Sequence, residues 1–200
     1  MNEETDEVPT SFGRGVGSFF WELLKAFLIA IVIIVPIRYF LVQPFFVRGA
    51  SMEPTFDDGE YLVIDQLSYR FRQPQRGEVI VFRYPNQPSQ FFIKRIIGLP
   101  GETVRVENGQ VVIENSQHPE GVILNEVPYL PSGVRTGGQE RLMLSQNEYF
   151  MLGDNRPSSS DSRSWGPLTS DEIIGRVWIR AFPFDQLTVF SPANAGFLGL

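Results

Sequence analysis

The sequence predicts a mainly β protein in which a single N-terminal transmembrane helix precedes an antiparallel β-sheet domain. An apolar segment occupies residues 19–42, and beyond it short runs of Val, Ile and Phe alternate with Gly, Pro and Asn. Short runs of β-branched and aromatic residues bounded by turn-forming residues favour strands over long helices. A chain of 200 residues is long enough to bury one core and to carry a small excursion from it.

The two ends of the chain are predicted to lie outside the folded domain. Residues 1–18 are acidic at first and then rich in Gly and Ser. They carry too little apolar surface to fold alone, so we expect a flexible N-terminal tail. Residues 193–200 are expected to form a C-terminal tail.

Residues 19–42 are expected to anchor the chain in a membrane. About 24 residues at about 1.5 Å each can cross a hydrocarbon core of about 30 Å. Glu22, Lys25 and Arg38 leave only residues 26–37 free of charge, a length that also fits the apolar region of a signal peptide or a buried core helix. Lys25 and Arg38 can extend their charged ends toward opposite membrane surfaces, which is compatible with a spanning helix.

An uncleaved anchor is favoured over a cleaved signal peptide. A cleavage site would need small residues soon after the apolar run, but RYFLVQPFF follows instead. Trp21 and Tyr39 suit the two membrane interfaces. Positive charges before and after the span nearly balance, so charge alone does not orient the anchor.

Residues 43–192 carry the pattern of a β-rich domain. Turns are predicted at DDGE, PGE and ENGQ, and an excursion rich in Pro, Gly and polar residues is expected at about 115–146. The expected strands are EYLVIDQLSY (60–69), GEVIVFRY (77–84), QFFIKRIIG (90–98), ETVRVENGQVVI (102–113, divided by the ENGQ turn), EYFMLG (148–153) and GRVWIRAF (175–182).

The composition excludes several classes of enzyme and partner. The chain has no cysteine and one histidine, His118, which excludes cysteine proteases and zinc sites built from His and Cys. A Ser-His-Asp triad would have to use His118, which lies in the polar, turn-like segment NSQHPEG. The net charge of −6 argues against nucleic acid as a partner.

Acidic residues suggest a metal site only weakly. Asp154 and Asp161 could combine with Asp57, Asp58 and Glu60 of the FDDGE segment. That segment has the composition of a hairpin turn, and the spacing of a calcium-binding loop does not occur. We therefore expect neither a metal nor another cofactor.

Lys94 lies in the apolar segment FFIKRIIG. If this segment is a strand, alternation places Phe92, Lys94 and Ile96 on one face and Arg95 on the other. Loss of hydration disfavours the charged ammonium group and lowers the pKa of a lysine from about 10.4. Lys94 could then act as a general base near neutral pH, which a guanidinium group cannot do. The alternative is a structural lysine on an edge strand whose amine reaches solvent.

Two further segments could supply chemistry. Ser51 follows Gly49 and Ala50 in GASMEPT, where small residues leave room for a substrate backbone beside a nucleophilic hydroxyl. Residues 153–167, GDNRPSSSDSRSWGP, are crowded with side chains that form ordered turns. Taken alone, the first segment also fits a turn before a strand, and the second a tight polar loop.

In their order and combination these segments resemble the type I signal peptidase family, from the anchor to about Pro183. The matching pieces are the membrane segment, SMEPT, GEYLVIDQLSY, RGEVIVFRYP with FIKRIIGLPGE, and GDNRPSSSDSR with SWG. The resemblance implies a β-sheet catalytic domain of the signal peptidase type. It also implies a serine-lysine endopeptidase that removes signal peptides from exported precursors after small residues.

The resemblance assigns roles to individual residues. Ser51 is expected to be the nucleophile and Lys94 the general base. Ser159 is expected to form a hydrogen bond with Lys94 and to orient it. Asp161 and Arg163 match a charged pair that holds the loop together.

Further supporting positions follow from the same resemblance. Arg95 is expected near the charged pair of the loop. Gly49 stands where some family members carry a serine whose hydroxyl helps to stabilise the oxyanion. The oxyanion must then rely on the backbone N–H of Ser51, with Gly49 as a second possible backbone donor.

The substrate is expected to bind in an extended form beside the nucleophile. Phe45, Phe46 and Val47 would lead into the groove, and Met52 and Ile93 would help to wall the small pocket before the cleaved bond. An extended peptide can pair with strand edges, so that backbone hydrogen bonds supply affinity and pockets supply selectivity.

The expected partners are precursor proteins that carry signal peptides, together with membrane lipid. Family members place the β domain on the outer face of the membrane. We therefore expect a single-pass protein of the plasma membrane with an extracytoplasmic catalytic domain, or a protein of the thylakoid membrane. Two alternatives stay open: a self-cleaving serine-lysine peptidase of the repressor type, and a catalytically inactive, membrane-anchored β module that binds partners.

Overall fold

The computed structural model describes residues 12–36 and 42–190. The chain divides into two units between Leu41 and Val42. The described part of the first unit is a helix, and the second unit contains all of the described strands.

Helix α1 spans Phe12–Pro36. Its segment Gly17–Ile34 has a mean hydropathy of 2.0 and is long and apolar enough to cross a membrane. Within it, Lys25 Nζ lies 2.6 Å from Glu22 Oε1, so the two charges of the apolar segment are paired. These features agree with the predicted membrane anchor.

The helix differs in its limits from the predicted anchor over residues 19–42. Residues 12–18, assigned to the tail, are helical, because each residue added to an existing helix gains one backbone hydrogen bond without a new nucleation cost. At the other end Val42 begins strand β1. Residues 1–11 and 37–41, and the predicted C-terminal tail, lie outside the described residues.

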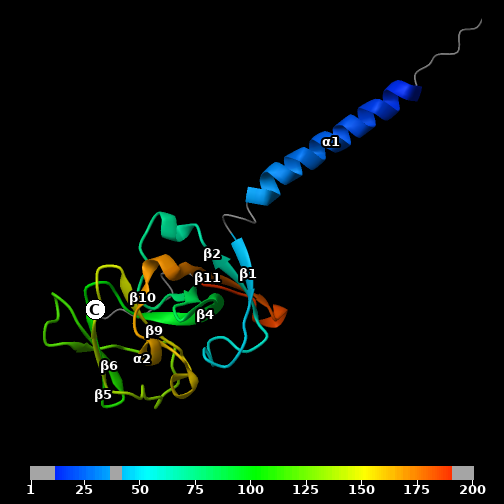
Figure 1. Ribbon diagram of the computed structural model, residues 1–200. Helices are drawn as coiled ribbons and strands as arrows, with labels where there is room; N and C mark the ends of the chain where they lie inside the picture. The colour runs from blue at the N-terminus through cyan, green and yellow to red at the C-terminus, as the bar shows by residue number, and fades with distance from the viewer. Residues whose placement is uncertain (1–11, 37–41, 191–200) are drawn as a thin grey trace, which may run out of the picture. The chain divides into compact units, whose positions relative to one another are not determined.

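The larger sheet is antiparallel and contains eight of the described strands, in the order β1-β2-β11-β3-β4-β9-β10, with β12 paired to β11. Figure 1 shows β1, β2 and β11 of this sheet next to one another. Its strands are β1 (Val42–Phe46), β2 (Tyr61–Asp65), β3 (Val79–Tyr84), β4 (Gln87–Gly98), β9 (Glu148–Leu152), β10 (Leu168–Thr169), β11 (Ile173–Phe182) and β12 (Thr188–Val189).

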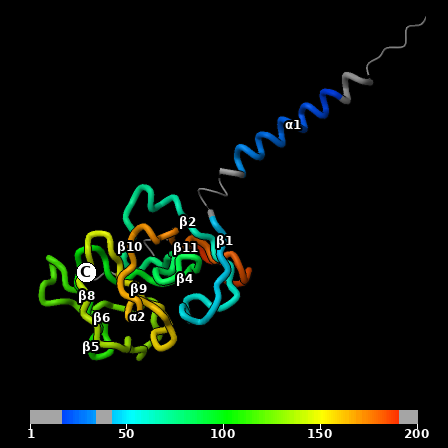
Figure 2. Tube along the Cα trace, in the orientation of Figure 1, coloured from blue at the N-terminus to red at the C-terminus, as the bar shows by residue number. Residues whose placement is uncertain are grey.

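The smaller sheet has the order β7-β6-β5-β8. Its strands are β5 (Thr103–Glu107), β6 (Gln110–Glu114), β7 (Val122–Ile123) and β8 (Glu140–Met143). The predicted ENGQ turn joins β5 to β6, with positive φ angles of 53° at Asn108 and 82° at Gly109, as tight hairpins require. Figure 2 shows β5, β6 and β8 together on the side of the domain away from β1 and β2.

The predicted excursion at about 115–146 is partly ordered as strand. Strand β7 pairs with β6, and β8 pairs with β5, so this region completes both edges of the smaller sheet. Between these strands it runs without further described helix or strand. A short helix, α2 (Ser162–Trp165), follows in the polar loop after β9.

Each predicted strand segment contains an observed strand, and the fold class is confirmed. The segment predicted over residues 60–69 ends early, at Asp65. The Asp65 carboxylate accepts hydrogen bonds of 3.0 Å from the backbone N–H groups of Leu67 and Ser68. These side-chain hydrogen bonds compete with the strand ladder and turn the chain, and a 3₁₀ helix follows at Ser68–Arg70.

Strand β1 was not predicted, because its sequence VQPFF contains Pro44. Proline lacks a backbone N–H and is tolerated mainly on edge strands. Strand β1 is the end strand of the larger sheet, and it pairs only with β2 among the described strands.

A buried apolar cluster lies beneath the segment that carries Ser51. Met52 and Phe56, both with 0% of their surface exposed, pack there with residues of β2, β3 and β11. The cluster consists of Val47, Met52, Phe56, Leu62, Ile64, Val79, Val81 and Val177. Burial of these two side chains fixes the backbone of the turn on which Ser51 sits.

Candidate active site

Ser51 lies on a closed loop between β1 and β2. Val47 N donates to Glu60 O at 2.9 Å, and Gly59 N donates to Val47 O at 3.1 Å, so the two ends of the loop are held together. Within the loop Phe56 N donates to Met52 O at 2.9 Å, which shapes the turn that starts at Ser51. The loop therefore presents Ser51 from a backbone fixed at both ends.

Lys94 reaches this loop from β4. Its Nζ lies 2.8 Å from Ser51 Oγ and donates to Ile93 O, also at 2.8 Å. The side chain passes 5.2 Å from the centre of the Phe92 ring, which alternation had placed on the same face of the strand. The structure thus brings together the predicted nucleophile and the predicted base, which are 43 residues apart in the sequence.

The surroundings of Lys94 lower its basicity. Only 3% of the residue is exposed, and burial lowers the pKa of its amine to about 8, against an opposing effect of the carboxylates of Asp161 and Asp154. A substantial fraction of the amine is therefore neutral near physiological pH. A neutral amine at hydrogen-bonding distance from a hydroxyl is able to accept its proton.

The loop after β9 forms hydrogen bonds to the backbone of the turn that carries Ser51. Asn155 N donates to Ser51 O at 3.1 Å, and Asn155 Nδ2 donates to Ala50 O at 3.0 Å. Gly153 leaves no room for a side chain: a Cβ built there would lie 2.5 Å from Ser51 O and closer still to Ser159 Oγ. These contacts set the position of the Ser51 backbone relative to β9.

Two ion pairs fix this loop. Arg163 Nε and Nη2 each lie 2.8 Å from an oxygen of Asp161. The Asp161 carboxylate also accepts hydrogen bonds from Gly153 N at 3.1 Å and from Arg163 N at 3.3 Å. Arg95 Nε donates to Asp154 Oδ1 at 2.8 Å, and its Nη2 to Asp154 Oδ2 at 2.5 Å. The predicted pair of Asp161 and Arg163 is present, and Arg95 pairs with Asp154. Asp154 and Asp161, two of the five acidic residues considered for a metal site, are thus paired with arginines.

Ser159 does not make the expected bond to Lys94 in this structure. Its Oγ is buried, packs against Gly153, and has no hydrogen-bond partner among the described residues. Lys94 Nζ instead uses Ser51 Oγ and Ile93 O. The role of Ser159 in orienting Lys94 stays a proposal.

Gly49 has a φ of 86°, a left-handed conformation that favours glycine. Its N–H donates to Asp58 Oδ1 at 2.6 Å, so this donor is already engaged. Among the described residues no acceptor receives the N–H of Ser51. The Ser51 N–H is therefore the better donor for an oxyanion, and Gly49 does not supply the second backbone donor in this geometry.

A groove of about 620 Å³ opens beside Ser51 and Lys94. Phe45, Val47 and Ile93 line it, as the sequence predicted. Met52 does not: it is fully buried in the apolar cluster below, because the turn after Ser51 directs its side chain into the core. Phe46, which was also predicted to lead into the groove, lines it as well. The other lining residues are Arg48, Leu62, Val81, Gln90, Phe91, Phe92 and Ser160.

The family described as signal peptidase, peptidase S26, matches residues 20–182 of this chain. The chain belongs to this family. Curated relatives extend the match over most of both sequences. A probable signal peptidase I-1 of Synechocystis is 36% identical over 174 residues, which cover 82% of this chain and 85% of that protein. A signal peptidase I of Bacillus amyloliquefaciens is 30% identical over 197 residues, which cover 94% of this chain and 98% of that protein.

A solved structure also matches. The crystal structure of a signal peptidase I from Enterococcus faecalis is 30% identical and covers 53% of this chain and 97% of that chain, with a TM-score of 0.44. The family membership confirms the resemblance drawn from the sequence and a serine peptidase hydrolase as the class of enzyme.

Some site residues of this peptidase S26 member were not predicted. Phe92 could have been found, since alternation places it beside Lys94. Leu62 and Val81 reach the groove only because β2, β11 and β3 lie side by side, an order that no local pattern reveals. Asn155 is part of the recognised GDNR segment, but nothing in the sequence shows that its amide contacts the residue before Ser51.

Proposed function

We propose that this protein is a membrane-bound serine endopeptidase that removes signal peptides from exported precursor proteins by cleaving after small residues. The observation that carries the proposal is the 2.8 Å contact between Ser51 Oγ and the buried amine of Lys94. The similarity to named signal peptidases supports the choice of substrate. Ser51 is the nucleophile and Lys94 the general base.

The geometry supports a two-step reaction. Neutral Lys94 accepts the proton of Ser51 Oγ as the oxygen attacks the carbonyl carbon of the scissile bond. The Ser51 N–H stabilises the oxyanion that forms. The Lys94 ammonium then gives its proton to the leaving amine, which departs as the new N-terminus of the mature protein. Water, deprotonated by Lys94, attacks the acyl carbon. The Lys94 ammonium then returns this proton to the departing Ser51 Oγ, which releases the signal peptide with a carboxylate at its C-terminus.

Open strand edges border the groove where the substrate would bind. Strand β4 pairs with β9 only between Arg95 and Gly98, so its preceding residues Gln90–Ile93 are not covered by β9. Strand β1 pairs with β2 on one side and with none of the described strands on the other. An extended peptide could hydrogen-bond to these edges, with side chains directed into the groove.

The proposed location follows from the anchor and the substrate. Helix α1 anchors the protein in a membrane, and signal peptides of exported proteins are accessible at the outer face. We therefore place the catalytic domain on the extracytoplasmic side of the plasma membrane, as a single-pass protein. The thylakoid membrane is the alternative location. Precursor proteins and membrane lipid are the proposed partners.

A cleavage assay tests the function directly. The full chain in detergent is incubated with a precursor that carries a signal peptide, and the products are mapped by mass spectrometry. One cut after a small residue at the end of the signal peptide supports the proposal. Cleavage of the chain itself alone would favour the repressor-type peptidase, and binding without any cut would favour the inactive β module.

The rate should depend on pH through Lys94. Because only the neutral amine accepts a proton, kcat/KM should rise about tenfold per pH unit at low pH and level off above the pKa of Lys94, near 8. Initial rates between about pH 6 and pH 10 measure this profile. An acidic limb centred near 10.5, the value for an unperturbed lysine, would show that burial does not activate the amine.

Ser159→Ala should lower the turnover rate without lowering the stability of the protein. The buried hydroxyl has no partner among the described residues, so its removal should leave the melting temperature unchanged or higher. If the hydroxyl orients Lys94 during the reaction, kcat should fall about ten- to hundredfold. Ser158→Ala, at an exposed position of the same loop, is the matched control. Equal kcat values for the two variants would remove Ser159 from the site.

A further inference from the structure

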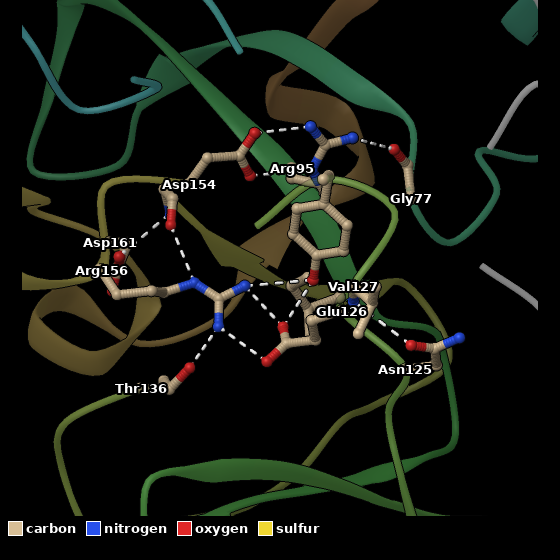
Figure 3. Close-up of polar contacts among 12 residues, drawn as sticks. Gly77, Arg95, Asn125, Glu126, Val127, Thr136, Asp154, Arg156 and Asp161 are labelled. Atoms are coloured by element: carbon tan, nitrogen blue, oxygen red, sulfur yellow. Dashed lines mark hydrogen bonds and ion pairs between the residues drawn. The ribbon is translucent and has the colours of Figure 1, made fainter. Parts of the chain in front are cut away.

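Arg156 is a fully buried cation held mainly by residues of the excursion. Only 1% of the residue is exposed. Its Nη2 lies 2.6 Å from Glu126 Oε1, and its Nη1 lies 3.0 Å from Glu126 Oε2. Nη2 also donates to Tyr129 Oη at 3.1 Å, and Nη1 donates to Thr136 Oγ1. Figure 3 shows the guanidinium group in contact with Glu126 and Thr136.

The same cation is connected to the loop that supports the nucleophile. Arg156 Nε donates to Gly153 O at 3.0 Å. Gly153 in turn lies against Ser51 O and Ser159 Oγ. The carbonyl that Arg156 binds therefore belongs to a residue that contacts the nucleophile residue directly. The Nε–H group of Arg156 thus fixes the orientation of the Gly153 carbonyl, next to the backbone of Ser51.

Tyr129 links the excursion to the second buried arginine of the site. Its ring lies 4.3 Å from the Arg95 guanidinium carbon, and its hydroxyl donates to Glu126 Oε1 at 2.5 Å. Arg95 holds Asp154, the residue between Gly153 and Asn155. Two residues of the excursion therefore support both arginines that fix the 153–155 segment.

Charge makes this arrangement sensitive to Glu126. A buried cation that loses its counter-ion must be rehydrated or must move, because an uncompensated charge in a dry site is strongly unfavourable. Movement of Arg156 would release Gly153 O, and displacement of a supporting segment by about 1 Å can reduce catalysis about hundredfold. Tyr129 also packs against a buried apolar cluster that includes Val106, Leu124 and Phe150.

We propose that Glu126, assisted by Tyr129, is a positioning residue for the Ser51–Lys94 pair, acting through Arg156 and Gly153. The excursion at 115–146 then has a catalytic purpose beyond completing the smaller sheet. This inference rests on the proposed function, because it concerns the same reaction.

The test compares Glu126→Gln, Tyr129→Phe and Glu120→Gln in the full chain in detergent. Glu126→Gln keeps the size and one acceptor but removes the charge, and Tyr129→Phe keeps the ring over Arg95 but removes the hydroxyl. Glu120 is an exposed residue of the same excursion with no ion pair among the described residues, so its variant is the matched control. For each protein, kcat and KM for precursor cleavage and the melting temperature are measured, with rates taken where all variants are folded.

A positioning role predicts that Glu126→Gln lowers kcat at least about tenfold, and Tyr129→Phe about three- to tenfold, with KM changed less than about twofold. The control should keep the wild-type kcat. A merely structural role would lower the melting temperature but leave kcat per folded enzyme unchanged, and that result would overturn the inference. If Glu126→Gln does not fold, Tyr129→Phe decides. Failure of the wild-type chain to cleave the precursor would instead refute the proposed function.

Discussion

Ser51→Ala and Lys94→Ala should each abolish precursor cleavage. Without Ser51 no hydroxyl oxygen can form the acyl-enzyme. Without Lys94, whose Nζ lies 2.8 Å from Ser51 Oγ, no base is in place to accept the hydroxyl proton. Nucleophile and base act as one unit, so each single variant should lose about as much activity as the double variant, on the order of 10⁴-fold or more. Initial rates with a labelled precursor measure the losses, with Ser158→Ala as the unaffected control.

The pattern of the three losses distinguishes the proposed mechanism from others. If the double variant were far slower than either single variant, the two residues would act independently. If Lys94→Ala kept substantial activity, another base would serve Ser51. Either result would contradict the assignment of the pair.

The same lysine should carry a cost in stability. A fall of the Lys94 pKa from 10.5 to about 8 corresponds to about 3 kcal/mol that opposes folding whenever the amine is charged. The unfolded chain binds the proton more tightly, so this cost is complete below pH 8 and disappears as the pH rises toward 10.5. Lys94→Met, which keeps the apolar stem, should therefore be inactive and melt at a higher temperature than the wild type at neutral pH.

Much of the fold follows from local patterns in the sequence. Short runs of Val, Ile and Phe bounded by turn-forming residues predicted β3, β4 and the β5–β6 hairpin. Strand β1 was missed because Pro44 masks it, and only its place at the sheet edge makes it acceptable. The early end of β2 depends on Asp65, whose carboxylate binds the next N–H groups; such competition is hard to weigh from sequence.

The reacting residues of the site were easier to predict from sequence than the residues that hold them in position. Ser51 and Lys94 stand in segments whose residue types suit a nucleophile and a buried base, and their contact follows from the fold. Met52 was misplaced because the direction of its side chain depends on the turn geometry. The connection from Glu126 through Arg156 to Gly153 joins residues distant in sequence, and no periodicity reveals such a contact.

Gly153→Ala should nearly abolish cleavage, with a loss of at least about hundredfold in kcat. The new methyl group would lie 2.5 Å from Ser51 O and closer still to Ser159 Oγ. Ser51 O cannot move freely because it accepts the Asn155 N–H, and Gly153 itself is held by hydrogen bonds to Asp161 and Arg156. Overpacking of this kind costs about 1–3 kcal/mol and displaces backbone, and here the displaced backbone is that of the nucleophile.

Gly137→Ala is the matched control for this substitution, since a Cβ at Gly137 would meet no atom within 4 Å. It should keep the wild-type rate and melting temperature. For Gly153→Ala we would measure kcat, KM and the melting temperature. The rates are compared at a temperature at which both variants are folded. The loss should appear in kcat even in fully folded protein, because the Ser51 oxygen no longer lies in line with the Lys94 amine. Wild-type turnover in a folded Gly153→Ala enzyme would show that the turn tolerates displacement, and that close packing behind Ser51 does not set its reactivity.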